Sequence, residues 1–285
     1  MLSLIEKENN NTDKILKPDF NQKTGRELLA FYLQTKFKQM LAYDRKCDTP
    51  VFLDIRPDFI SKFSKRLINN PSKRLLIGIT GESACGKSTI CTQIKDTIKN
   101  FGLPVSIIST DNYFNDISAL IKQYGDFDNL RDNGYDIDSP ESFQLDLFKK
   151  DLEAISQGQD IKCPKYLTNG TGVSVQNSIL VESQKIIVVE GIAAMYKDAK
   201  DLFDVKIYVE ANCDERKERF FKRAAERNQD EQNAQKHWDY IQIASEKYIK
   251  PFKNEADMTL SGASDLEYFA QILEYFHAIT NNFAQ

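Results

Sequence analysis

The segment over residues 81–88 reads Gly-Glu-Ser-Ala-Cys-Gly-Lys-Ser and fits the pattern G-x-x-x-x-G-K-[ST] at every fixed position. A continuous apolar run at residues 75–79 precedes it, which is typical of a strand buried on both faces, and residues 87–100 have the pattern of a helix. Glycines allow backbone N–H groups to curl around phosphate oxygens, and a helix start adds a positive partial charge. The sequence therefore predicts a phosphate-binding loop, the P-loop, between a buried strand and a helix.

The residue types of the P-loop indicate how it would hold a nucleotide. The Lys87 ammonium can reach the outer phosphates, and the Ser88 hydroxyl is suited to bind Mg²⁺. Kinases, ATPases and GTPases all use such a loop, and the lack of an Asn-Lys-x-Asp guanine motif in the chain disfavours a GTPase. We expect ATP to contact Gly81, Glu82, Ser83, Ala84, Cys85, Gly86, Lys87, Ser88 and Thr89.

The composition narrows the class of protein. The 285 residues include 38 Lys and Arg against 42 Asp and Glu, a net charge of -4, which argues against a dedicated nucleic-acid binder. Only two histidines are present, His237 and His277, which excludes a His-rich metal site. The five cysteines form no C-x-x-C pair, the first residues lack the apolar stretch of a signal peptide, and no apolar run is long enough for a membrane span. We expect a cytoplasmic protein that binds neither nucleic acid nor membranes.

Strands alternate with helices after residue 73, a pattern that predicts an α/β fold with a parallel sheet covered by helices on both faces. Residues 73–285 are expected to form this main P-loop domain, and residues 1–72 an N-terminal helical extension packed on it. A separate partner-binding role is the alternative for the extension. We expect strands at 75–79, 105–108, 186–189, 205–209 and 258–260, and helices at 25–43, from 57, at 87–100, from 139, at 213–228, 234–249 and 264–281.

Two acidic residues end predicted strands on the side where the P-loop lies. Asp111 follows the second strand, and ligands of open parallel sheets bind at the carboxyl ends of the strands. A carboxylate there can accept the proton of an attacking hydroxyl or bind a metal, whereas a turn-forming Asp is the alternative. Glu190 ends the third strand at the equivalent height and could order Mg²⁺, with helix capping as the alternative.

Four arginines lie on one face of the helix predicted at 213–228. Their spacing of i, i+3, i+7 and i+11 places Arg216, Arg219, Arg223 and Arg227 in one stripe. The stripe fits a lid helix whose guanidinium groups close on phosphates, since planar forks suit phosphate oxygens. A solvated stripe paired with nearby glutamates is the alternative.

Together these segments resemble the phosphoribulokinase/uridine kinase family over about residues 73–262. The resemblance is carried by Gly-x-Ser-x-x-Gly-Lys-Ser-Thr in the P-loop, by the strand ends at Asp111 and at Val-Glu-Gly-Ile, and by the arginine-bearing segment from residue 213. Residues 136–143 look like the family's Asp-x-Pro-x-x-Phe segment, and residues 163–166 look like its Pro-x-Tyr hairpin. The resemblance implies a nucleoside-kinase-like P-loop NTPase fold and ATP-dependent phosphorylation of an alcohol group on a small molecule.

The resemblance also implies roles for individual residues. Asp111 would be the catalytic base, and Lys87, Arg219 and Arg223 would act on the phosphates. Mg²⁺ would be held by Ser88, Asp111 and Glu190. Asp138 and Arg216 would contact substrate hydroxyls and Tyr166 the base, and the expected substrate-binding residues are Tyr113, Asp138, Tyr166 and Arg216.

The sequence leaves open which molecule accepts the phosphate. Uridine kinases place a His shortly after the hairpin Tyr, and residues 167–171 contain none. A nucleoside is the first expectation, and pantothenate or a sugar phosphate is the alternative. A catalytically silent ATP-binding sensor that signals through residues 1–72 is the alternative from a different class. A homo-oligomeric assembly also stays open.

Overall fold

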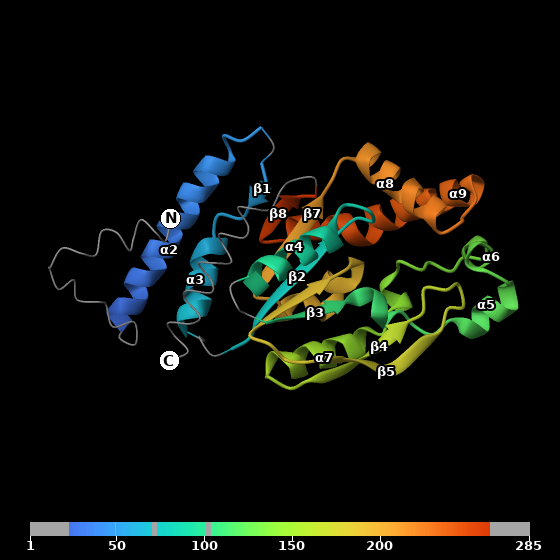
Figure 1. The fold of residues 1–285 in the computed structure, drawn as a ribbon, viewed down its shortest axis with the longest axis horizontal. Coiled ribbons are helices and arrows are strands. Elements are labelled where there is room, and N and C mark those ends of the chain that lie inside the picture. The colour runs from blue at the N-terminus through green and yellow to red at the C-terminus, as the bar shows by residue number, and fades with distance from the viewer. Residues whose placement is uncertain (1–22, 49, 70–72, 101–103, 263–285) are drawn as a thin grey trace.

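A computed structural model describes residues 23–48, 50–69, 73–100 and 104–262. A six-stranded sheet in the order β1-β8-β7-β2-β6-β3 forms its centre, and every neighbouring pair is parallel except β1 with β8 (Figure 1). The α/β fold with a parallel sheet is therefore confirmed. The strands are β1 (Phe52–Ile55), β2 (Leu75–Gly81), β3 (Val105–Ser109), β6 (Ile186–Glu190), β7 (Val205–Glu210) and β8 (Met258–Ser261).

Helices surround this sheet, and a separate antiparallel hairpin of β4 (Ile161–Tyr166) and β5 (Ser174–Val181) lies beside it. Figure 1 shows α2 and α3 at one end of the molecule and α5, α6, α8 and α9 at the other. The part of the chain that the structure describes includes no helix apolar and long enough to cross a membrane. The helices are α2 (Lys23–Asp44), α3 (Phe59–Asn69), α4 (Lys87–Asn100), α5 (Ser118–Tyr124), α6 (Phe127–Asp132), α7 (Leu145–Ser156), α8 (Cys213–Glu226) and α9 (Glu231–Ala244).

Each face of the sheet has its own hydrophobic core, because successive side chains of a buried strand point to opposite faces. Leu75, Ile77 and Ile79 of β2 pack with side chains of α3 and α4 on one face. Leu76 packs on the other face with Phe148 and other residues of α7. The continuous apolar runs of the sequence thus become strands buried on both sides, and they hold the P-loop at the carboxyl end of β2.

Most predicted elements are present within a few residues of their expected ends, and one differs in kind. The helix predicted to open at Ser139 is a short 3-10 turn at Pro140–Ser142, and α7 begins only at Leu145. The Ser139 side chain does not cap the turn, and the Ser142 hydroxyl donates to the Asp136 carbonyl instead. The helix expected at 264–281 lies outside the described residues.

The front segment contributes a strand that the sequence pattern did not indicate. β1 pairs antiparallel with β8 at the edge of the sheet, with Phe52 opposite Leu260. The buried Asp44 carboxylate accepts hydrogen bonds from the amides of Val51 (2.9 Å) and Phe52 (3.0 Å), which fixes the start of this strand. Phe59 packs edge-on to Phe37, so α2 and α3 share one aromatic cluster with β1. The division of the chain at residue 72 stays a prediction.

Candidate active site

The P-loop leaves the carboxyl end of β2 and runs directly into α4, as the sequence predicts. Gly81 has φ +147° and Gly86 φ +105°, in a region that favours glycine. A Cβ atom on Gly81 would lie 2.3 Å from the Val209 carbonyl oxygen, and one on Gly86 would lie 2.9 Å from that of Gly262. The two fixed glycines of the pattern are therefore required both by conformation and by close backbone packing.

Lys87 lies across the inside of this loop. Its Nζ donates to the carbonyl oxygens of Gly81 at 2.8 Å and of Glu82 at 2.9 Å. Such a lysine is placed to exchange these backbone acceptors for phosphate oxygens when a nucleotide enters. The ammonium is thus held at the mouth of the loop before any ligand binds.

Two other P-loop side chains point away from the phosphate site. Cys85 is fully buried in the core under the loop, so only its backbone is available to a nucleotide. Glu82 is also buried, and its Oε1 lies 2.7 Å from Nη1 of Arg216. Within residues 81–89, only Ser88 and Thr89 are exposed.

Asp111 follows β3, and three neighbouring charged groups act on its carboxylate. Desolvation by surrounding protein atoms raises the pKa of Asp111, the Glu190 carboxylate raises it further, and Lys87 and Arg227 oppose these effects. The side chain nevertheless stays exposed to solvent. A raised pKa favours proton acceptance, because it makes the carboxylate a stronger base.

Ser88 and Glu190 come together next to Asp111. The Ser88 hydroxyl lies 3.3 Å from Oε2 of Glu190, and the Asp111 and Glu190 carboxylates are close enough to raise the pKa of Asp111. Hydroxyl and carboxylate oxygens suit Mg²⁺, which takes one or two protein carboxylates and completes its shell with phosphate oxygens and water. Within the described ranges, no group of three or more His, Cys, Asp or Glu side chains could hold an ion by itself.

The arginines of α8 lie in different environments. Arg216 is 2% exposed, and its Nε donates to the Ser83 carbonyl at 3.1 Å. Its guanidinium also stacks on the Trp238 ring at 5.4 Å. The structure thus places Arg216 under the P-loop, where its contacts with Ser83 and Glu82 support the loop.

Arg219 and Arg223 lie one helical turn apart. Nη1 of Arg219 lies 3.5 Å from both the Ala84 and the Gly262 carbonyl oxygens, at the rim of the P-loop. Arg223 is exposed further along α8. Arg227 closes the helix, and its charge acts on both Asp111 and His237. The stripe predicted from the spacing therefore begins at the P-loop and ends with Arg227 near Asp111.

The expected substrate residues are brought to the cleft only in part. Asp138 lies near Asp111 and Lys87, since both act on its pKa, and burial raises that pKa to about 6. Tyr166 of β4 lies 5.2 Å from Phe114, and burial raises its pKa to about 12. Tyr113 is 1% exposed and donates its hydroxyl proton to Asp151, so it belongs to the core under β4.

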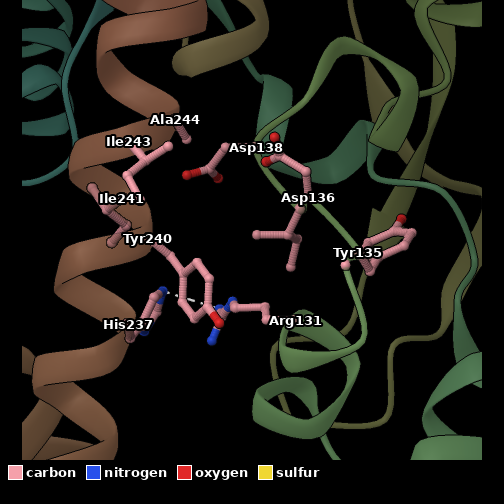
Figure 2. Close-up of a pocket in the computed structure, with 11 residues that line it drawn as sticks. Arg131, Tyr135, Asp136, Asp138, His237, Tyr240, Ile241, Ile243 and Ala244 are labelled. Atoms are coloured by element: carbon pink, nitrogen blue, oxygen red, sulfur yellow. Dashed lines mark hydrogen bonds between the residues drawn. The ribbon is translucent and has the colours of Figure 1, made fainter.

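A cavity of about 210 Å³ lies between α9 and the segment around α6. Some of the residues that line it were not indicated as site residues by the sequence. Arg131 and His237 line it together with Asp136 and Asp138 (Figure 2). Neither Arg131 nor His237 belongs to a recognisable motif, and more than 100 residues separate them in the sequence. No local sequence signal could have placed them in one site, because only the packing of α9 against α6 joins them.

The fold and the site define a P-loop nucleotide-binding protein of the kinase type. The chain matches the Phosphoribulokinase / Uridine kinase family over residues 76–267, and it belongs to that family. The expected resemblance is therefore confirmed.

Individual relatives agree with this assignment. "Uridine-cytidine kinase A" of Dictyostelium discoideum is 30% identical over 209 residues, which cover 71% of this chain and 38% of that protein. "Uridine kinase" of Halobacterium salinarum is 30% identical over 187 residues, which cover 65% of this chain and 78% of that protein. The phosphoribulokinase from Rhodobacter spheroides aligns with a TM-score of 0.50 at 15% identity, covering 66% of this chain and 69% of that one, and shows a shared fold.

Proposed function

We propose that the protein transfers the γ-phosphate of ATP to a hydroxyl group of a nucleoside. The observation that carries this proposal is the position of Asp111, a solvent-accessible carboxylate whose pKa Lys87 lowers and which in turn raises the pKa of Asp138. A phosphate held by the P-loop and a hydroxyl held near Asp138 would meet at this carboxylate. The names of the relatives favour a nucleoside as the acceptor.

The chemistry follows from the arrangement of these side chains. Asp111 orients the acceptor hydroxyl and accepts its proton as the oxygen attacks the γ-phosphorus. The bond between this phosphorus and the bridging oxygen of ADP breaks, and Lys87 stabilises the charge that collects on the phosphate oxygens. Arg219 and Arg223 approach from α8 and supply further positive charge.

We further propose that Ser88, Glu190 and Asp111 hold Mg²⁺ together with the phosphates. The ion would neutralise phosphate charge during transfer. The separation of Ser88 from Glu190, 3.3 Å between oxygens, supports this set of donors. A cytoplasmic location fits the free state of Cys47, Cys85, Cys91, Cys163 and Cys213.

A panel of acceptors tests the proposal directly. The purified protein is incubated with ATP, Mg²⁺ and one of uridine, cytidine, pantothenate or ribulose 5-phosphate, and ADP release is followed. ADP release that depends on a nucleoside is the expected result. Release that depends only on pantothenate or a sugar phosphate would identify another acceptor class, and ATP binding without acceptor-dependent release would identify a nucleotide sensor.

A further inference from the structure

The cavity between α6 and α9 has two chemically different ends. Figure 2 shows the Asp136 and Asp138 carboxylates at one end, and Arg131 and His237 at the other. The acidic end faces the reacting centre, because Asp111 and Lys87 both act on the Asp138 carboxylate. A ligand that fills the cavity would therefore meet carboxylates next to the site of phosphate transfer and a guanidinium remote from it.

The charges that line the cavity favour an uncharged ligand. The cavity is lined by two carboxylates, those of Asp136 and Asp138, and by one guanidinium, that of Arg131. That guanidinium already forms an ion pair with Asp128 at 3.0 Å. A carboxylate or phosphate group on the ligand would face an excess of negative charge and would lose its hydration on entry. Sugar hydroxyls suit the acidic end, because carboxylate oxygens accept hydrogen bonds from them.

Arg131 has hydrogen-bonding capacity left to offer a ligand. Its side chain is 8% exposed, its Nη1 donates to Asp128 at 3.0 Å, and its Nη2 donates to His237 at 3.1 Å. These two contacts use two of the five N–H groups of a guanidinium. Nε has no hydrogen-bond partner within the part of the chain that the structure describes. Buried donors of this kind are normally satisfied, so this N–H group is free to donate to an acceptor on a ligand.

His237 fixes the orientation of the guanidinium. Arginine can only donate, so Nε2 of His237 must be the acceptor, and the imidazole is neutral with its proton on Nδ1. The ring is held in turn by edge-on packing against Phe220 at 5.0 Å. Apolar side chains of α9, Ile241 and Ala244, also line the cavity, and Ala244 lies at the end of Asp138 (Figure 2). A flat ring with an acceptor on its edge matches this end of the cavity.

We propose that this cavity binds the base of the nucleoside, and that Arg131, oriented by His237, donates hydrogen bonds to a carbonyl oxygen on the edge of that base. Arg131 is a binding residue that determines specificity, and His237 is a positioning residue. This inference rests on the proposed nucleoside kinase activity. Uracil and cytosine carry the required carbonyl oxygen, whereas adenine does not, so the cavity selects the first two.

Steady-state kinetics with uridine and adenosine test the role of Arg131. Arg131→Gln removes the guanidinium, and the KM for uridine should rise about 10- to 100-fold, the loss expected for a hydrogen bond from a charged group. The kcat for uridine and the Kd for ATP should change less than about threefold, because the reacting centre is untouched. Adenosine should be a poor acceptor for the wild-type protein, and its KM should not change in the variant.

A second variant covers the case in which Arg131→Gln does not fold. Arg131→Lys keeps a cation opposite Asp128 but loses the planar fork, and it should raise the KM for uridine in the same way. The matched control is Lys236→Gln, which removes a cation from the same contact between α9 and α6. Lys236 does not line the cavity. The control should have wild-type kinetics.

Two substitutions of His237 separate positioning from simple packing. His237→Gln keeps an acceptor close to the position of Nε2 and should retain the wild-type KM for uridine. His237→Leu removes the acceptor and should raise that KM several-fold. If His237 had only a structural role, both substitutions would change the KM for uridine by the same factor.

The outcomes separate this inference from the proposed function. Uridine turnover with an unchanged KM in Arg131→Gln would overturn the inference and leave the kinase activity standing. An equal rise in KM for uridine and adenosine would also overturn it, because the effect would then be structural. Absence of ADP release with every nucleoside would overturn the proposed function itself.

Discussion

The guanidinium of Arg216 and the carboxylate of Glu82 form an ion pair at 2.7 Å, with side-chain exposures of 3% and 8%. Glu82 belongs to the P-loop and Arg216 to α8, so this pair joins the P-loop to α8. Both groups are desolvated, and without Arg216 the Glu82 carboxylate would keep only the more distant Lys250 ammonium, at 4.0 Å.

Breaking this pair should destabilise the whole protein. We expect Arg216→Gln to lower the free energy of unfolding by about 3–5 kcal/mol, because the buried Glu82 carboxylate would lose its close partner and keep only Lys250 at 4.0 Å. Urea unfolding followed by circular dichroism measures this loss. The double variant Glu82→Gln/Arg216→Gln should recover much of it, since no unpaired charge remains. A double variant as unstable as the single one would contradict the importance of the ion pair.

Asp111→Asn should separate nucleotide binding from turnover. The amide cannot accept the proton of the attacking hydroxyl, so we expect kcat to fall by on the order of 10²–10⁴. ATP affinity should be nearly unchanged, because the P-loop binds through its backbone amides and Lys87. Isothermal titration with ATP and ADP release with uridine give the two quantities. Undiminished turnover would remove Asp111 from the mechanism.

Arg219 should act on phosphate transfer more than on folding. Its guanidinium lies at the rim of the P-loop and is only partly buried. We expect Arg219→Gln to lower kcat by on the order of 10²–10³, the cost of one donor to a developing charge. Lys222→Gln removes a similar charge from the exposed side of the same helix and serves as the control. Equal kcat values in the two variants would show that α8 acts through overall charge.

The stability of the protein should depend on pH through His237. Burial lowers the pKa of His237 to about 3, with Arg131 and Arg227 contributing, whereas an unfolded His titrates near 6.5. Between these pH values the unfolded chain binds a proton that the folded protein does not, so stability falls as the pH decreases.

His237→Gln should remove this acid-dependent loss. Between about pH 6 and pH 4, the free energy of unfolding of the variant should rise relative to that of wild type by up to about 1.4 kcal/mol for each pH unit of acidification. Denaturant unfolding at several pH values measures the gain. Tyr240→Phe is the control, because it removes the hydrogen bond to Asp132 without removing a group that titrates in this range. A pH profile of His237→Gln parallel to wild type would contradict the neutral state of the buried imidazole.

Asp44 should stabilise the edge strand without affecting the chemistry. Asp44→Ala leaves the buried amides of Val51 and Phe52 without an acceptor, at a cost of about 1–3 kcal/mol for each. Limited proteolysis should cut the variant faster between α2 and β1, while the KM for ATP stays unchanged. Asp48→Ala alters an exposed carboxylate in the same connection and should resist proteolysis as wild type does.

Local sequence patterns predicted the P-loop, the alternating strands and helices, and the positions of Lys87, Ser88 and Asp111. These features depend on a few consecutive residues and on the order of the elements along the chain. The environment of Arg216 was not predictable, because helical spacing places four arginines on one face but does not say which one turns under the P-loop. The pairing of Arg131 with His237 depends on contact between distant helices, which no local pattern encodes.

The short strand β1 has a mechanical consequence for the phosphate site. β8 carries β1 on one side and β7 on the other, and the chain that leaves β8 reaches Gly262, whose α-carbon lies against the Cys85 and Gly86 backbone. The strand β8 thus contacts both β1, at its edge, and the P-loop, through Gly262 at its end. A bound molecule that shifts β1 would therefore also shift β8 and, through Gly262, the backbone of the P-loop.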